Sequence, residues 1–168
     1  MKIKNLIRGA LIGALYFALT VLFAPISFKA FQIRISESLT LLPFLTKEAI
    51  WGLFVGCFIA NFFSPFGIID IIFGSILTLI AAYLTYLLRR TKKLFLAPIP
   101  PILLNGFGVS FYITLLSMEK PSLNLFPLKL YLSISLSIIL GETLSTYLIG
   151  LPLTFYLSKL KFFKEENI

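Results

Sequence analysis

Long apolar runs separated by short polar stretches make up most of the chain. A helix needs about 20 apolar residues to cross the hydrocarbon core of a membrane. Between the first two runs of that length lie a short segment, 38–45, which ends around Pro43, and an apolar run of marginal length, 48–63. The pattern therefore predicts six membrane helices, over residues 6–26, 38–45, 48–63, 68–88, 96–118 and 130–157.

The distribution of positive charge favours six helices and sets their orientation. With six helices both termini share one side, and that side receives eleven of the 15 Lys and Arg residues, including the RRTKK stretch at 89–93. Because basic residues concentrate in cytoplasmic loops, both termini are predicted to be cytoplasmic. A five-helix arrangement with 38–45 as a loop would place the RRTKK stretch outside.

The composition agrees with lipid as the main solvent of the chain. Hydrophobic residues make up 58% and charged residues 13% of the 168 residues, whereas a soluble domain averages about 25% charged residues. We therefore expect an all-α integral membrane protein that forms a single transmembrane domain over residues 1–168. The net charge of +8 comes from the clusters that set topology, so a nucleic-acid partner is not expected.

The residue types present exclude several kinds of catalytic site. The chain has no histidine, one cysteine, Cys57, and one aspartate, Asp70. A Ser–His or Cys–His nucleophile pair, a helical zinc site and an aspartate dyad each need residues that are missing here. No catalytic residue, metal site or bound cofactor is predicted, and we do not expect an enzyme.

Few polar residues lie within or beside the apolar runs. A charge deep in a bilayer costs at least about 2.5–3.5 kcal/mol, so such residues usually face the protein interior and often mark a substrate path. The set is predicted to gather in the outer half of the membrane and consists of Glu37, Asn61, Asp70, Asn105 and Glu142, with Arg34 just outside.

Each of these residues also has a purely structural interpretation except Glu142. Asn61 and Asp70 would serve as helix caps around the Ser64–Gly67 turn, Asn105 as an interhelical hydrogen bond, and Glu37 as the partner of Arg34. Glu142 has neither a cation nor a cap nearby in the sequence.

The convergence of these groups predicts a binding pocket for a small, flat molecule. Carboxylates and carboxamides provide paired hydrogen-bonding groups, and aromatic side chains such as Trp51 provide stacking faces. A nucleobase-like or vitamin-like ligand suits this chemistry. The segment FQIRISESLTLLPF at 31–44 is interpreted as the gate of the pocket, with Arg34 either pairing with Glu37 or contacting ligand.

Small residues form stripes on two predicted helices. A spacing of four places them on one helix face, where another helix can approach closely. One face of 6–26 is a candidate for internal packing or for docking of another membrane subunit. The stripes are Gly9 with Gly13, then Ala10, Ala14 and Ala18, and then Gly52, Gly56 and Ala60.

Several segments, in order, resemble the QueT family, the proposed queuosine-precursor S-components of energy-coupling-factor (ECF) transporters. They are the run from FQIRISES to AAYLTYLL, the proline-rich LAPIPPILLNG, and GETLSTYLIGLPL. The resemblance covers roughly residues 7–157. It implies a six-helix S-component bundle in the bacterial plasma membrane and a deazaguanine substrate such as queuine or its aminomethyl precursor.

The resemblance also implies partners and residue roles. The partners are a membrane coupling protein, EcfT, and two cytoplasmic ATPase subunits, which would use the ATP. The stripe of Ala10, Ala14 and Ala18 matches the docking pattern of such components. Glu142 or Glu37 would read the guanine-type edge, Asp70 would meet an aminomethyl cation, and Asn61 and Asn105 would read the carbonyl and ring nitrogens.

Three other interpretations stay open. The alternatives are an S-component for another vitamin-like solute, a stand-alone proton-coupled secondary carrier, and a structural membrane scaffold. The carrier is disfavoured because the chain shows no internal inverted repeat, and a scaffold would not need converging polar residues.

Overall fold

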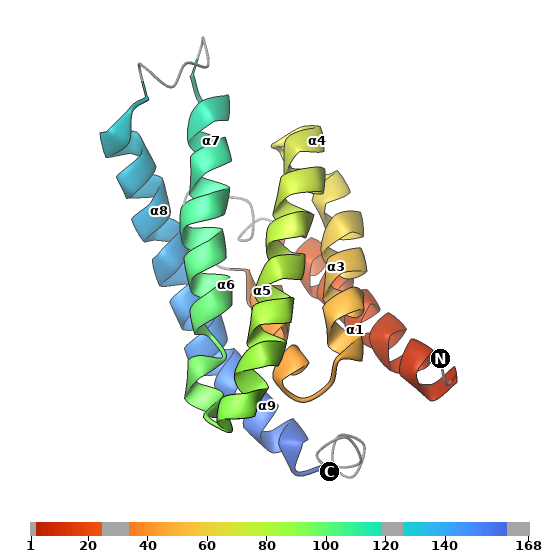
Figure 1. Ribbon diagram of the computed structural model, residues 1–168. Coiled ribbons are helices and arrows are strands. Elements are labelled where there is room, and N and C mark those ends of the chain that lie inside the picture. The colour runs from red at the N-terminus through yellow and green to blue at the C-terminus, as the bar shows by residue number, and fades with distance from the viewer. Residues whose placement is uncertain (1–2, 25–33, 119–125, 161–168) are drawn as a thin grey trace.

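A computed structural model describes residues 3–24, 34–118 and 126–160 (Figure 1). Every regular element among these residues is helical. The predicted all-α class is therefore confirmed for the described part of the chain. The predicted gate lies partly at 31–33, outside the described residues.

Four helices in the described ranges are long and apolar enough to cross a membrane, which makes the chain a multi-pass membrane protein. They span Ile3–Leu22, Gly67–Thr91, Leu94–Leu116 and Leu128–Ser158, and each corresponds to one of the four long predicted runs. The first is α1 (Ile3–Leu22). The second joins α4 (Gly67–Ile69), η3 (Asp70–Gly74), α5 (Ser75–Leu88) and η4 (Arg89–Thr91).

The third and fourth long helices also change winding along their length. The third joins η5 (Leu94–Leu96), α6 (Ile99–Leu103), η6 (Leu104–Val109) and α7 (Ser110–Leu116). The fourth joins α8 (Leu128–Thr143), η8 (Leu144–Gly150) and α9 (Leu151–Ser158). The segments η3, η6 and η8 are π-helical, and such turns within α-helices occur frequently at functional sites.

Two shorter segments complete the bundle. α3 (Glu48–Ala60) continues into η2 (Asn61–Phe63), which agrees with the predicted run 48–63. The predicted short helix is a 3₁₀ helix, η1 (Ile35–Phe44), and its residues from Ser36 to Phe44 are all buried. η1 contacts α1, α3, α5, η8 and α9, so it lies inside the bundle. The six-helix membrane count and the cytoplasmic termini stay predictions.

Helices α1 and α3 approach each other through glycines. A Cβ atom on Gly52 would lie 2.4 Å from the carbonyl oxygen of Gly9, and one on Gly56 would lie 2.5 Å from that of Gly13. The backbones can approach this closely only because these residues have no side chain. The glycine stripes of the two helices thus serve internal packing, while Ala10, Ala14 and Ala18 stay exposed on α1.

Candidate functional site

Two glutamates from distant parts of the chain meet at one asparagine inside the bundle. The Nδ2 atom of Asn105 donates to Oε1 of Glu142 at 2.6 Å and lies 3.4 Å from Oε2 of Glu37. Because both oxygens contact the same nitrogen, the two carboxyl groups lie side by side. Glu37, Glu142 and Asn105 are each at most 5% exposed. We call Glu37 and Glu142 the carboxylate pair.

Helix α1 provides a further donor to this pair. The hydroxyl of Tyr16, which is fully buried, donates to Oε1 of Glu37 at 2.5 Å. One turn later, the Thr20 hydroxyl donates to Oγ of Ser36 at 2.8 Å. These two contacts attach the buried 3₁₀ segment to α1 at the point where it presents Glu37.

One oxygen of the pair has no hydrogen-bond donor among the described residues. Oε2 of Glu142 is buried and makes no hydrogen bond within the described ranges. Leaving a buried carboxyl oxygen without a partner is costly, so native proteins usually satisfy such groups. This oxygen is therefore free of hydrogen bonds to the described residues, and the proposal below takes it up.

A second polar cluster surrounds Asp70. Nη2 of Arg34 lies 3.6 Å from Oδ2 of Asp70, and the hydroxyl of Tyr112 donates to Oδ1 of the same carboxylate. Nδ2 of Asn61 donates to the backbone carbonyl of Asp70 at 2.9 Å. A Cβ atom on Gly74 would lie 2.7 Å from Asp70 Oδ1, so glycine at this position leaves room for the cluster. We call it the Arg34–Asp70 cluster.

The two clusters are joined through the start of η1. Arg34 and Glu37 are separated by three residues, and the amide of Glu37 donates to the carbonyl of Arg34 at 3.0 Å. The same carbonyl accepts the Ser145 hydroxyl at 2.8 Å, which connects it to η8 just after Glu142. The structure adds a partner for Arg34 that the sequence analysis did not include, because its guanidinium forms an ion pair with Asp70. Whether Arg34 also pairs with Glu37 or contacts ligand stays a prediction.

The polar residues occur where the long helices change winding. Asp70 opens η3, Asn105 lies in η6, and Glu142 lies two residues before η8. The three residues thus lie in or beside π turns, which occur frequently at functional sites.

Trp51 is not brought together with these clusters. Its side chain is 65% exposed and packs edge-on against Phe54, with ring centroids 6.2 Å apart. It lines a groove between α1 and α3 on the outside of the bundle. The structure therefore does not support stacking of the Trp51 ring on a ligand bound at these clusters.

Two tyrosines belong to the site although the sequence reasoning did not include them. Tyr16 donates to Glu37 and Tyr112 to Asp70. The sequence signal for Tyr16 was its position between two polar residues of α1. It lies eight residues after Arg8 and four residues before Thr20, so the three share one helix face. The signal for Tyr112 was its distance of seven residues from Asn105, two turns along the same helix face.

Comparison with known proteins gives one family and one curated relative. A family model described as QueT transporter matches residues 6–159. The relative, named "Queuosine precursor transporter QueT", is from Lactococcus lactis subsp. cremoris (strain MG1363) and is 36% identical over 89 residues. The aligned stretch covers 52% of this chain and 52% of the relative, so the chain spans about half the length of the relative it matches. No solved structure matches the chain.

Proposed function

The chain belongs to the QueT transporter family, and on that basis we propose that it is the substrate-binding membrane subunit of an ECF-type importer for a queuosine precursor. The observation that carries the proposal is the contact of the buried side chains of Glu37 and Glu142 with Asn105 inside a membrane bundle. The name of the Lactococcus lactis relative supports the substrate class.

The ligand is proposed to bind at the carboxylate pair. A guanine-type edge presents a ring N–H beside an exocyclic amine, and a glutamate can accept from both. The unsatisfied Oε2 of Glu142 supports this role for Glu142. Asn105, with both a donor and an acceptor on its amide, suits a ligand carbonyl or ring nitrogen.

Asp70 receives a different role from the one expected of it. Its carboxylate already accepts from Tyr112 and pairs with Arg34. We therefore assign the ammonium of an aminomethyl precursor to the carboxylate pair, and assign Asp70, Arg34 and Asn61 to holding η1 in position. Since the carboxylate pair is buried, entry of the ligand requires packed segments to separate.

The partner assignments follow from the same proposal. Ala10, Ala14 and Ala18 are exposed on α1, opposite the face that carries Tyr16, and this supports docking of an EcfT-type coupling protein there. ATP hydrolysis is assigned to two cytoplasmic ATPase subunits. The six-helix arrangement with both termini in the cytoplasm belongs to this proposal, supported by the charge distribution.

Calorimetry on the detergent-purified chain tests the substrate assignment. We expect binding of aminomethyl-deazaguanine or queuine, and loss of most of that binding in Glu142→Gln. Glu48→Gln is the matched control, because Glu48 is another buried glutamate, hydrogen-bonded by Thr46 away from the site. Unchanged affinity in Glu142→Gln would remove the carboxylate pair from the proposal. Binding of an unrelated vitamin alone would instead assign the chain to another solute.

The adjacent carboxyl groups also suit a proton-coupled carrier, because two such groups can share and release a proton. Uptake into vesicles that contain only this chain separates the two functions. Transport driven by a pH gradient without ATPase subunits would favour the carrier, whereas an importer subunit stays inactive without them.

A further inference from the structure

The carboxylate pair places two acidic groups beside each other in the protein interior. The amide nitrogen of Asn105 carries two hydrogens, and it contacts Oε1 of Glu142 at 2.6 Å and Oε2 of Glu37 at 3.4 Å. Both glutamates are at most 4% exposed. Two negative charges this close, in an interior from which water is excluded, oppose each other's formation. The geometry thus favours a single negative charge for the pair.

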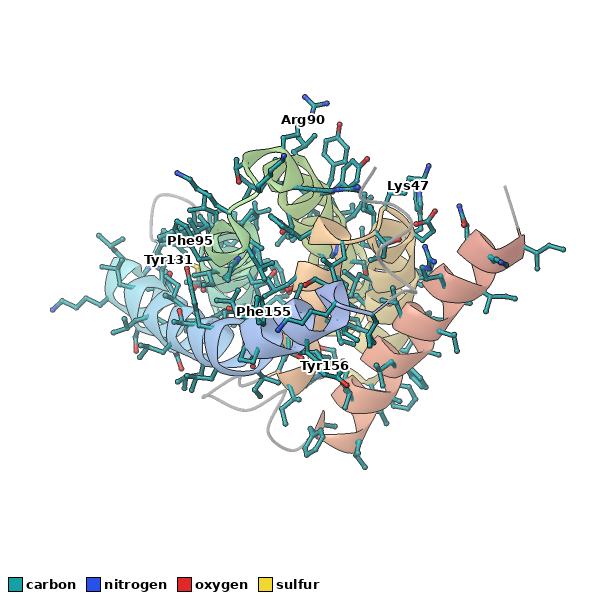
Figure 2. The ribbon with its side chains drawn as sticks, turned by 90° about the horizontal axis from the view of Figure 1, so that it is seen from below. Lys47, Arg90, Phe95, Tyr131, Phe155 and Tyr156 are labelled. Atoms are coloured by element: carbon teal, nitrogen blue, oxygen red, sulfur yellow. The ribbon has the colours of Figure 1, made fainter. Side chains whose placement is uncertain are left out.

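The charged groups around the pair do not supply enough positive charge for two carboxylates. Among the described residues, Arg34 is the cation that acts on both glutamates, and its guanidinium lies 3.6 Å from Oδ2 of Asp70. One cation therefore faces three carboxyl groups. Lys47 and Arg90 project from the outside of the bundle (Figure 2). The other titratable groups on this side are Tyr16 of α1, Cys57 of α3 and, beside Asp70, Tyr112 of α7.

The two glutamates differ in the hydrogen bonds that stabilise a negative charge. Glu37 accepts the Tyr16 hydroxyl at Oε1 and the Asn105 amide at Oε2. Glu142 accepts the same amide at Oε1, whereas its buried Oε2 has no donor among the described residues. Because donated hydrogen bonds favour the ionised form of a carboxyl group, Glu37 suits the negative charge. Oε2 of Glu142 is then the position that suits the proton.

We infer that the ligand exchanges its positive charge for this proton, so that the site selects a cationic amine and releases one H⁺ when it binds. The ligand enters with its amine protonated, as lysine is at neutral pH. While the packed segments are separated, the O–H bond at Oε2 of Glu142 breaks and the proton passes to solvent. The ammonium group then neutralises the charge left on the pair. One positive charge leaves as another arrives, so the interior gains no net charge.

This inference rests on the proposed function, because it takes a deazaguanine as the ligand. Calorimetry at one pH in two buffers of different ionisation enthalpy counts the protons released. The probes are aminomethyl-deazaguanine and hydroxymethyl-deazaguanine, which differ in one group and in charge. We expect release of about one proton with the first, whose affinity should rise about tenfold per pH unit near neutrality. The second should release none and bind about 10- to 100-fold more weakly, because it lacks a charged donor.

Infrared spectroscopy of the ligand-free chain detects the proton without any ligand. A protonated carboxyl group has a C=O stretching band that is distinct from the bands of a carboxylate. We expect such a band at neutral pH, its loss in Glu142→Gln, and its loss from the unmodified chain when the aminomethyl ligand is added. The last measurement needs no variant, so it holds even if Glu142→Gln does not fold.

Glu48→Gln is the matched control for both measurements. Glu48 is also a buried glutamate, and its carboxylate accepts the Thr46 hydroxyl at 2.5 Å. This variant should retain the ligand-sensitive band and the proton release.

The outcomes separate this inference from the proposed function. Binding of the aminomethyl ligand without proton release would overturn the inference and leave the proposed function in place, as would a band unchanged in folded Glu142→Gln. Equal affinity for the two ligands would remove the selection for a cation. Absence of binding by both deazaguanines would instead overturn the proposed function, and the exchange with it.

Discussion

Replacement of Tyr16 by Phe removes one hydroxyl from the interior and leaves the ring in place. Tyr16 is fully buried, and its hydroxyl donates to Oε1 of Glu37 at 2.5 Å. Within the described residues, the other side chain that donates to this carboxyl group is Asn105, at the longer distance of 3.4 Å. The change therefore tests whether α1 holds the 3₁₀ segment through this hydrogen bond.

The expected cost lies near the upper end for a hydrogen bond in a membrane bundle. Interhelical hydrogen bonds there average about 0.6 kcal/mol, with a maximum of about 1.7, whereas bonds to charged groups in soluble proteins contribute about 1.5–3 kcal/mol. Because the acceptor is a buried carboxyl group and the contact is short, we expect Tyr16→Phe to lower the free energy of unfolding by about 1.5 kcal/mol.

The assay is reversible unfolding in mixed detergent micelles, with a double-mutant cycle of Tyr16→Phe and Glu37→Gln. The coupling energy should account for most of the loss. Tyr131→Phe is the matched control, because Tyr131 donates to a backbone carbonyl at 3.4 Å in an exposed position. If the two tyrosine variants lost equal stability, or if the coupling energy fell below about 0.5 kcal/mol, the contact would not hold the segment.

Three further variants test other parts of the structure. Gly52→Ala should lower the free energy of unfolding by about 1–3 kcal/mol in the same assay, because the new Cβ atom would meet the α1 backbone. Ala18→Leu, at an exposed position of α1, is the control and should change this free energy little. A similar loss of stability in both variants would contradict close packing of α1 on α3. Arg34→Gln should cost about 3–5 kcal/mol by leaving Asp70 without its cation, and adding Asp70→Asn should recover part of this; no recovery would contradict the ion pair. Ala14→Leu should reduce co-purification with the coupling subunit while ligand binding by the free chain persists; undiminished co-purification would exclude this face.

The sequence was sufficient for the helical segments because their signals are local. Long apolar runs predicted the four long helices to within a few residues of their ends, and Pro43 marked the end of the short one. The polar residues in these runs were also informative. Exposing them to lipid costs so much that they were expected to face the protein interior, and Glu37, Asn105 and Glu142 do meet there.

The partners of these residues depend on helix rotation and depth, which local patterns do not contain. Arg34 could be assigned to Glu37 by spacing alone, whereas its ion pair with Asp70 depends on where the second long helix passes η1. Trp51 was included for its ring, but the rotation of α3 points its side chain to the exterior. The π turns that contain Asp70 and Asn105 have no clear signature in the sequence.

The burial of η1 has a consequence for how the protein is assembled in the cell. At a rise of about 2 Å per residue, ten residues of 3₁₀ helix reach about 20 Å, less than the roughly 30 Å hydrocarbon core. The segment cannot stand alone in lipid, since its polar side chains would lack partners there. Among the elements that surround it are η8 and α9, which follow all the other described elements along the chain. Glu37 therefore reaches its final position only after η8 and α9 have been synthesised and inserted, so the site cannot form while the first helices alone are in the membrane.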